Sequence, residues 1–380
     1  MDGVNRTRTG GPVGANLFAV RSHNTALVLD LLRAAGGEGI SRLELAERTG
    51  LTPQAVSKIT ARLREAGLAA EAGRRASTGG KPRTVLRLVP EAGHAVGVQL
   101  DRDELRAVLV DLDGAVVGER RRALDLGAGA EAVLGVVAGA VEGLVGEALD
   151  VAGRGLGEVA SLLGAGVALP GPLDHAGGVL HRVTGFPEWE GFPLRDALAE
   201  RLGVPVVVDK DTNAAALGLA VGGEGGSFAY LHLGTGLGAG LVIGGSVHRG
   251  VRTGAGEFGH QVLQLDGPVC ECGDRGCVEA LCLAAVERGE TAEAARVLGV
   301  GAGNLVALLD IDLVLLGGRT VAAAPEAFVD GVAKVLDARA RREGPLGARV
   351  PVRLAPGGER AVAEGAAQLL LAPLFGRADG

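Results

Sequence analysis

Aromatic side chains are scarce in this chain of 380 residues, which contains seven Phe, one Tyr and one Trp. Small aliphatic residues, chiefly alanine and valine, must therefore fill its core. Hydrophobic residues still make up 47% of the sequence, which excludes a disordered chain. Long apolar runs are also missing, because charge, glycine or proline interrupts each one before it could span a membrane. The N-terminus lacks the apolar segment of an export signal, so we expect a cytoplasmic protein without a membrane partner.

Charge is unevenly distributed along the chain. The first 90 residues carry 14 Lys and Arg against 7 Asp and Glu, although the whole chain has a net charge of −7. The remaining 290 residues therefore carry 24 basic against 38 acidic side chains. A basic front end on an acidic body indicates that only residues 1–90 contact a polyanion. The alternative is a basic surface that is merely solvated.

Only four cysteines are present, and three of them lie within eight residues. With a preceding histidine they form the pattern H-x9-C-x-C-x4-C, made by His260, Cys270, Cys272 and Cys277. One imidazole and three thiolates match the tetrahedral ligand set of a structural zinc site, which leaves no position for a reactive water. Separate buried thiols and disulfides are the alternatives, and a reducing cytoplasm disfavours disulfides. Cys282 lies outside this spacing, and we expect it to be a core thiol.

The same stretch reads G-E-x-G-H followed by C-x-C-G-x-x-G-C-x-E, and it resembles the ROK family of repressors, uncharacterised reading frames and sugar kinases. The resemblance implies that Glu257, His260 and Glu279 hold sugar hydroxyls, while zinc fixes the loop that carries them. Side-chain chemistry agrees with this, because carboxylates accept hydrogen bonds from hydroxyls. An imidazole can bind a metal through one nitrogen and a hydroxyl through the other.

Three short helices are predicted between residues 22 and 67. The second opens at Ser41, which forms a capping box with Glu44 three residues later. The third opens with Thr52 as N-cap and Pro53 at the first helical position. Helix, short turn and helix at this size indicate a helix-turn-helix.

Residues 69–89 predict two strands joined by a basic, glycine-rich turn, as in the wing of a winged helix-turn-helix. Such a slim cationic turn suits a minor groove or a row of phosphates. The alternative is a solvated hairpin. ROK repressors carry a winged helix-turn-helix at this place, and ROK kinases lack it. We expect DNA contacts from the third helix and the wing, made by Gln54, Ser57, Lys58, Arg62, Lys81 and Arg83.

After Pro90 the pattern changes to strands in hairpins and then to strands alternating with helices, all repeated once. This order predicts an α/β body with two lobes. The resemblance implies a body like that of actin and hexokinases, with a ligand cleft between two ribonuclease-H-like lobes. The expected division is a flexible tail at 1–21, a DNA-binding domain at 22–90 and a body at 91–380. Within the body we expect a small lobe at about 93–208 plus a C-terminal helix at about 360–372, and a large lobe at about 209–359.

Two neighbouring residues bear on the chemistry of the cleft. Asp211 matches the aspartate that is the catalytic base of ROK kinases, although a simple helix N-cap is the alternative. Lys210 replaces an asparagine that normally binds sugar in the family. We expect Lys210 to pair with Asp209 or Asp211, or to meet an anionic ligand.

ROK kinases have D-x-G-G-T in their first hairpin, where glycines let phosphates approach backbone N–H groups. This chain has Asp101-Arg102-Asp103-Glu104-Leu105 instead. Both glycines are replaced, and two extra carboxylates stand where an anionic nucleotide would lie, so ATP binding should be greatly weakened. The second glycine-rich loop, at 234–240, survives. We therefore expect no enzyme activity.

These features predict a DNA-binding transcriptional regulator, usually a repressor, whose body senses a sugar or sugar derivative. Its expected partners are double-stranded operator DNA and a second copy of the chain, since helix-turn-helix proteins commonly read two half-sites. The sequence does not distinguish a dimer from a tetramer. The alternatives are a sugar kinase with an attached DNA-binding domain and a DNA-binding scaffold with a dead cleft.

Overall fold

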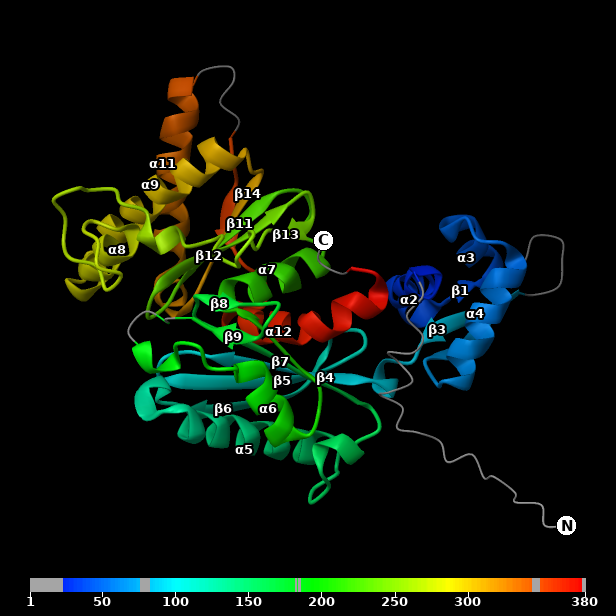
Figure 1. The fold of residues 1–380 in the computed structure, drawn as a ribbon. Helices are drawn as coiled ribbons and strands as arrows, with labels where there is room; N and C mark the ends of the chain where they lie inside the picture. The colour runs from blue at the N-terminus through cyan, green and yellow to red at the C-terminus, as the bar shows by residue number, and fades with distance from the viewer. Residues whose placement is uncertain (1–22, 76–82, 182, 184–185, 344–348, 378–380) are drawn as a thin grey trace, which may run out of the picture.

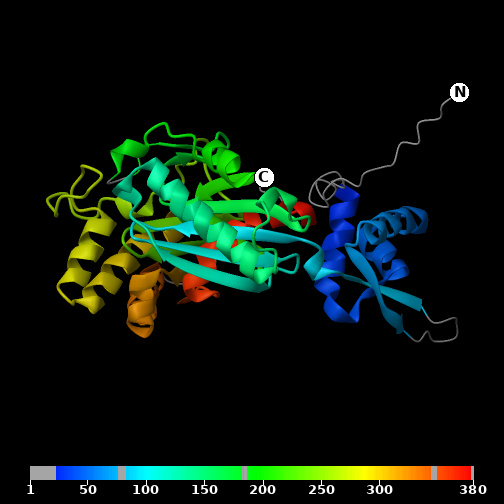
Figure 2. The same cartoon turned by 90° about the horizontal axis from the view of Figure 1, so that it is seen from below.

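A computed structural model describes residues 23–75, 83–181, 183, 186–343 and 349–377 of the chain. A small N-terminal domain lies beside a larger body, which is built from two sheets and their helices (Figure 1). Seen from below, the small domain projects from one end of the body (Figure 2). The tail predicted at 1–21 lies outside the described residues.

The N-terminal domain has the predicted helix-turn-helix with a wing. Both halves of the capping box form, because Ser41 Oγ accepts from the Glu44 amide at 3.3 Å and Glu44 Oε2 accepts from the Ser41 amide at 2.8 Å. Thr52 Oγ1 caps the third helix by accepting from the Ala55 amide at 3.2 Å. The helices are α2 (His23–Ala35), α3 (Arg42–Thr49) and α4 (Pro53–Glu65), and the sheet has the order β1 (Ile40–Ser41), β3 (Arg83–Leu88), β2 (Ala69–Arg75).

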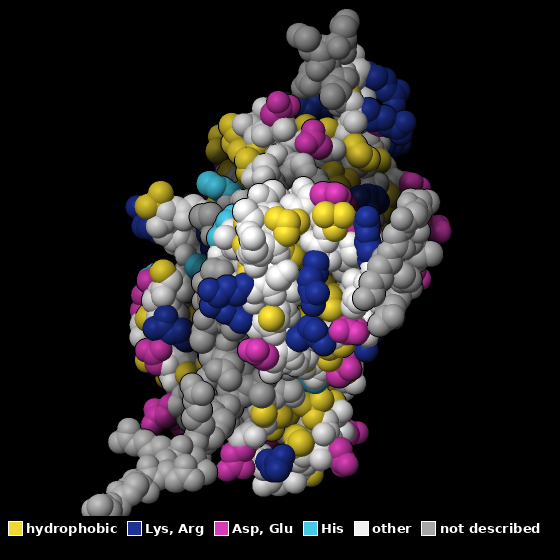
Figure 3. Space-filling model, turned by 90° about the vertical axis from the view of Figure 1, so that its right-hand side faces the viewer, with side chains coloured by type: hydrophobic (Ala, Val, Ile, Leu, Met, Phe, Trp, Pro, Cys, Tyr) yellow, Lys and Arg dark blue, Asp and Glu magenta, His cyan; other side chains and the backbone are white. Residues whose placement is uncertain are grey.

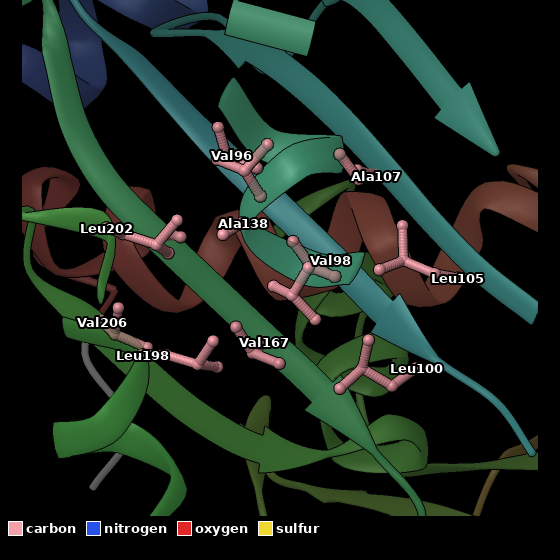
Figure 4. Close-up of a cluster of buried hydrophobic side chains, with 14 of the residues drawn as sticks. Val96, Val98, Leu100, Leu105, Ala107, Ala138, Val167, Leu198, Leu202 and Val206 are labelled. Atoms are coloured by element: carbon pink, nitrogen blue, oxygen red, sulfur yellow. The ribbon is translucent and has the colours of Figure 1, made fainter. Parts of the chain in front are cut away.

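The first sheet of the body has the strand order β10-β7-β4-β5-β6. Strands β4, β5 and β6 form an antiparallel meander, whereas β7 and β10 run parallel to β4. Valine, leucine and alanine fill the layer between this sheet and its helices, as the shortage of aromatics requires (Figure 4). The bounds are β4 (His94–Leu100), β5 (Glu104–Asp111), β6 (Val116–Ala123), β7 (Leu162–Leu169), β10 (Val206–Lys210), α5 (Ala130–Ala148) and α6 (Leu194–Leu202); a short hairpin pairs β8 (Leu173–Asp174) with β9 (Val179–Leu180).

The second sheet has the order β13-β12-β11-β14-β15. Helix α9 accompanies this sheet, and its apolar stretch is long enough to cross a membrane. Half of that stretch is buried inside the protein, and α9 packs on α8 and α11, as expected for a core helix. The bounds are β11 (Phe228–Leu233), β12 (Leu237–Ile243), β13 (Ser246–Val247), β14 (Leu313–Gly317), β15 (Val352–Leu354), α8 (Val278–Glu287), α9 (Thr291–Leu309), α10 (Arg319–Ala323) and α11 (Pro325–Glu343).

Helices α7 (Asp211–Val221) and α12 (Ala361–Leu371) lie between the two sheets (Figure 1). Glycine allows them to touch, because a Cβ on Gly365 would collide with the carbonyl oxygen of Ala214. Glycine also seats α12 on the first sheet, where a Cβ on Gly97 or Gly166 would collide with the α12 backbone. The C-terminal helix therefore packs on the first sheet.

The N-terminal domain and the body share one buried cluster. Leu32 of α2 and Leu86 of β3 belong to the same cluster as Leu371 of α12 and Phe375, which lies in the short helix η9 (Ala372–Phe375). The guanidinium of Arg33 stacks 4.8 Å from the centre of the Phe375 ring. The winged domain is thus packed against the body and is not only tethered to it.

Candidate functional site

The histidine and three cysteines of the predicted metal pattern converge. His260 Nδ1 lies 3.6 Å from Cys270 Sγ, and Cys272 Sγ lies 3.7 Å from Cys277 Sγ. All four ligand atoms lie within 4.8 Å of one another, so they could hold one metal ion. Every cysteine is a free thiol, which contradicts the disulfide alternative. Cys282 is buried away from the group against Ala294 O, as expected for a core thiol.

A polar cavity of about 90 Å³ opens between the lobes beside this group. Its wall combines the junction of β10 with α7, the glycine-rich turn before β12, the short helix η6 (Phe258–His260) and the start of α8. The five predicted ligand-binding side chains all line it: Lys210, Asp211, Glu257, His260 and Glu279. Sequence positions about 70 residues apart therefore meet in one cleft.

Glu279 holds the cleft wall in place. Its side chain is buried, and Oε2 accepts a hydrogen bond of 2.7 Å from the Leu237 amide at the start of β12. Cys270 Sγ lies 4.0 Å from the other oxygen. Each oxygen has one donor among the described residues, so both keep a lone pair that could accept from a hydroxyl in the cleft.

Lys210 pairs with a residue that the sequence did not indicate. Its Nζ donates to Glu257 Oε1 at 2.9 Å and to the carbonyl oxygen of Ala255. The predicted pairing with Asp209 or Asp211 is therefore wrong. The loop from Gly250 to Glu257 folds over the end of β10, and it brings Glu257 closer to the ammonium than either aspartate.

Asp209 has a different partner, which sequence reasoning missed. Its side chain is fully buried, and Oδ2 lies 2.7 Å from Arg249 Nη2. Asn213 Nδ2 and the Lys210 amide both donate to Oδ1, at 3.0 and 2.7 Å. Arg249 comes from the loop after β13, and nothing in its local sequence signals a contact with β10. The pair fixes the loop that carries Glu257.

Asp211 is the first residue of α7, and Lys210 takes the N-cap position, so the N-cap alternative for Asp211 is wrong. Asp211 Oδ1 accepts from the Thr212 amide at 2.7 Å. Burial raises the pKa of Asp211, and the nearby His232 opposes that rise. His232, whose Nδ1 lies 2.9 Å from the Tyr230 hydroxyl, is a second cleft residue that the sequence did not single out.

Comparison with known proteins agrees with this geometry. The ROK family pattern matches residues 95–288, and a winged helix-turn-helix DNA-binding pattern matches residues 24–69. The chain belongs to the ROK family. Its N-terminal winged helix-turn-helix and its ROK body together account for the fold predicted from the sequence.

Curated relatives of this ROK protein carry the names of repressors. The DNA-binding transcriptional dual regulator NagC of Escherichia coli is 33% identical over 281 residues, which are 72% of this chain and 66% of that protein. The xylose repressor of Bacillus subtilis is 29% identical over 69% of this chain and 66% of its own length. The match to the xylose repressor of Caldicellulosiruptor bescii, at 30% identity, spans 63% of this chain and 59% of that protein.

Solved structures of ROK proteins share the architecture. A ROK family transcriptional regulator, described as a homolog of E. coli MLC protein, superposes with a TM-score of 0.72 over 94% of this chain and 98% of its own, at 21% identity. The ROK hexokinase of Thermus thermophilus is 31% identical, with a TM-score of 0.55, and covers 72% of this chain and 96% of its own. The hexokinase match leaves more than a quarter of this chain uncovered, whereas the regulator match includes nearly all of it.

The first hairpin of the ROK body makes contacts between the lobes. Arg102 pairs with Glu271 of the cysteine loop, and Asp103 pairs with Arg319 of α10, each at 3.0 Å. Thr235 Oγ1, in the surviving glycine-rich loop, donates to Asp101 Oδ1 at 2.7 Å. Of the two carboxylates predicted to repel a nucleotide, Asp103 is thus engaged with the opposite lobe, whereas Glu104 pairs with Arg106 of its own strand at 3.3 Å.

The predicted DNA-contacting side chains divide into two groups. On α4, the exposed side chains include Gln54, Ser57, Lys58 and Arg62, while Val56, Ile59 and Leu63 face the core. Arg83 is exposed at the first residue of β3. Lys81 lies outside the described residues. Several Lys and Arg side chains appear on the face of the molecule that the winged domain occupies (Figure 3).

Replacing Asp209 with asparagine should destabilise the protein by about 3 kcal/mol, because the buried Arg249 guanidinium loses its counter-charge. Chemical denaturation of the variant measures this loss. The matched control is Asp196→Asn, which breaks the exposed pair with Arg195 and should leave stability unchanged. Equal stability of the two variants would contradict the structural role of Asp209.

Proposed function

We propose that the chain is a transcriptional repressor that binds operator DNA through α4 and the wing, and that its ROK body binds a sugar or sugar derivative in the cleft. One combination of features carries this proposal. Helix α4 exposes polar side chains to solvent, and in the same chain ion pairs connect the hairpin where ROK kinases bind phosphate to the opposite lobe. The relatives named as xylose and N-acetylglucosamine repressors support it. Binding of operator DNA implies a cytoplasmic protein.

The DNA interface follows from the side chains on α4. Gln54 and Lys58 are long, exposed and polar, so they can reach base edges in a major groove. Arg62 and Ser57 suit phosphates or bases, and Lys81 and Arg83 belong to the wing, where cations bind phosphates without reading sequence. Two half-sites would require a homodimer, or a tetramer of two such dimers.

The sugar site follows from the cleft. Glu257, Asp211 and Glu279 offer carboxylate acceptors for hydroxyl groups, and His260 offers a ring nitrogen. The Lys210 ammonium group pairs with Glu257 and so neutralises part of the negative charge of the cleft. The position of this ammonium group therefore contributes to sugar specificity. All five side chains are proposed ligand contacts.

Zinc is the metal that the Cys3His group suits best. Zinc–sulfur bonds of about 2.3 Å in a tetrahedron place neighbouring sulfurs about 3.8 Å apart, and the two closest ligand contacts here are 3.6 and 3.7 Å. Four protein ligands leave no open position, so the ion would be structural. It would fix His260 and the start of α8, and through them Glu279, at the cleft wall.

The alternative function is a ROK-type ATP-dependent sugar kinase with an attached DNA-binding domain. Asp211 stands at the catalytic-base position, which favours that alternative. The residues 101–105 oppose it, because Asp103 and Arg102 form ion pairs where nucleotide phosphates would need free backbone N–H groups. We therefore propose that the body senses its ligand without phosphorylating it.

A continuous set of contacts leads from the cleft to the winged domain. Helix α7 begins at Asp211 in the cleft and ends at Val221, whose carbonyl oxygen accepts from Arg377 Nη1 at 3.0 Å. The same guanidinium pairs with Asp30 of α2 at 3.1 Å. A ligand that shifts α7 would thereby shift α2. By linkage, operator DNA must weaken ligand binding by the same factor by which ligand weakens DNA binding.

Purified protein should contain about one zinc ion per chain, and Cys272→Ser should lower both the zinc content and the sugar affinity, because the loop loses one of four ligands. Elemental analysis and sugar titration measure the two effects. Cys282→Ser is the control, since this buried thiol lies outside the group and should keep the metal. A well-folded wild-type protein without zinc would refute the assignment.

The protein should not phosphorylate glucose or N-acetylated hexoses at rates typical of enzymes, roughly 1 per second or more. A coupled assay with ATP tests this. The double variant Asp103→Gly, Glu104→Gly should bind ATP more tightly than wild type, because it removes two carboxylates and restores backbone access. Turnover by the wild-type chain would favour the kinase alternative.

Wing and cleft variants should separate DNA affinity from the response to ligand. Lys81→Ala with Arg83→Ala should weaken binding to all DNA sequences and reduce the salt slope by about one unit per lost phosphate contact. Gln54→Ala should instead change preference at particular bases, by about 1–3 kcal/mol. Glu257→Ala and Asp211→Ala should bind DNA like wild type without effector but lose the effector response. Anisotropy titrations with and without sugar measure all three effects.

The control for these titrations is Arg296→Ala, which removes an exposed cation from α9 of the body and should change neither DNA affinity nor the response to effector. Full effector response in the cleft variants would place the effector elsewhere. Wild-type salt dependence in the wing variants would contradict the DNA interface.

A further inference from the structure

A second cavity lies where the winged domain meets the body. Its volume is about 250 Å³, against about 90 Å³ for the cleft. The wall is built by α2, the turn between β5 and β6, the end of α7 and one side of α12, and it includes Arg33, Gly114, Gly222, Glu224, Glu364 and Gln368. We call this space the junction cavity. Neither the proposed DNA interface nor the proposed sugar site uses it.

Two buried polar atoms on this wall have no partner within the described residues. They are Arg33 Nη1, a donor, and Gln368 Oε1, an acceptor on a side chain that is only 7% exposed. Both side chains approach the same turn, because a Cβ on Gly114 would lie 3.2 Å from Arg33 Nη2 and 3.2 Å from Gln368 Nε2. A buried polar atom without a hydrogen bond costs about 1–3 kcal/mol. Neither atom is accessible in this structure, so a bound molecule that supplies both an acceptor and a donor recovers this energy after the two side chains turn toward the cavity.

Two carboxylates on this wall are already paired, and the third, that of Asp113, is exposed to solvent. Glu364 accepts from Arg360 at 2.9 Å, and Glu224 accepts from Arg353 at 2.9 Å. Arg33 Nη2 donates to the Asp113 carbonyl oxygen at 3.0 Å. A charged ligand would have to displace one of these partners, whereas a neutral one would not. Hydroxyl groups both donate and accept, so a single polyhydroxylated molecule can satisfy Arg33 and Gln368 together.

We propose that the junction cavity is a second small-molecule site, which takes a neutral sugar or polyol and is distinct from the cleft. Its volume is several times the roughly 30 Å³ that a water molecule occupies in the liquid. It approaches the lower limit of about 300 Å³ for small-molecule pockets, so it suits a monosaccharide and no larger ligand. This site goes beyond the proposed effector cleft and does not depend on it.

A ligand at this place touches the winged domain and both helices that lie between the sheets of the body. Arg33 belongs to α2 of the winged domain, Gln368 to α12, and Gly222 to the end of α7. Occupancy therefore stabilises the packing of the winged domain on the body that the structure shows. It would act on the orientation of α4 directly, without passing through lobe closure.

Equilibrium dialysis of the full-length protein with labelled D-xylose, D-glucose and N-acetyl-D-glucosamine tests the site. Wild type should bind two molecules per chain of at least one of these sugars, and Glu257→Ala, which disables the cleft, should bind one. Adding Gln368→Leu to Glu257→Ala should weaken the remaining site about tenfold, because the buried acceptor is lost at nearly constant volume. Gln264→Leu, an exposed position on the cysteine loop, is the matched control and should not weaken it.

Arg33→Gln provides a second route, since it removes Nη1 while Gln368 stays in place, and it should weaken the same site. Because this variant also loses the stack on Phe375 and the bond to the Asp113 carbonyl oxygen, unchanged zinc content and circular dichroism establish that it is folded. The proposal is overturned if Glu257→Ala binds none of the three sugars, or if neither Gln368→Leu nor Arg33→Gln weakens its residual binding. The junction cavity then holds water only. Failure of the cleft assignment looks different, because Glu257→Ala would retain the full wild-type stoichiometry.

Discussion

The close packing of α12 is the constraint on which the rest of this structure depends. The helix comes last in the body, yet it fills the space between the first sheet, α7 and the winged domain. Glycines at Gly97, Gly166 and Gly365 remove the Cβ atoms that would hold these surfaces apart. Because interiors are packed as densely as crystals, a single added methyl group at such a contact must move a backbone. The lobes and the winged domain are therefore mutually positioned by a segment that the chain supplies only near its end.

Buried charge gives the cleft its shape. Asp209 and Arg249 are both almost inaccessible, and Lys210 beside them reaches Glu257. Isolated charges at such depth would cost several kcal/mol each, so the pairs hold the loop before η6 in one position. The ion pairs of Arg102 and Asp103 lie nearer the surface and contribute less to stability. They instead connect the hairpin to the opposite lobe, which sets how far the cleft is open.

Local sequence signals predicted the helices, strands and metal ligands, whereas contacts between distant segments determine how the cleft side chains are paired. The capping box at Ser41, the N-cap at Thr52 and the cysteine spacing are encoded by residues close together, so they could be predicted directly. The partner of Lys210 could not, because it depends on how the loop after β13 crosses the end of β10. Arg249 and Arg319 were missed for the same reason, since an arginine with a distant ion-pair partner looks like any other arginine in the local sequence. The junction cavity is even harder to predict from the sequence, because it forms only where α2 of the winged domain meets α12 of the body.

The buried cluster shared by the winged domain and the body has a consequence for how such regulators diversify. Leu32 and Leu86 lie in one apolar core with Leu371 and Phe375, so part of the free energy that folds the DNA-binding domain comes from the body. Such a domain cannot be exchanged as an independent module. A new operator specificity can arise on the solvent side of α4 without disturbing this core, whereas a transplanted winged domain must bring, or find, a complementary surface on α12. The interface thus confines change on the winged domain to a few exposed positions while the body is preserved.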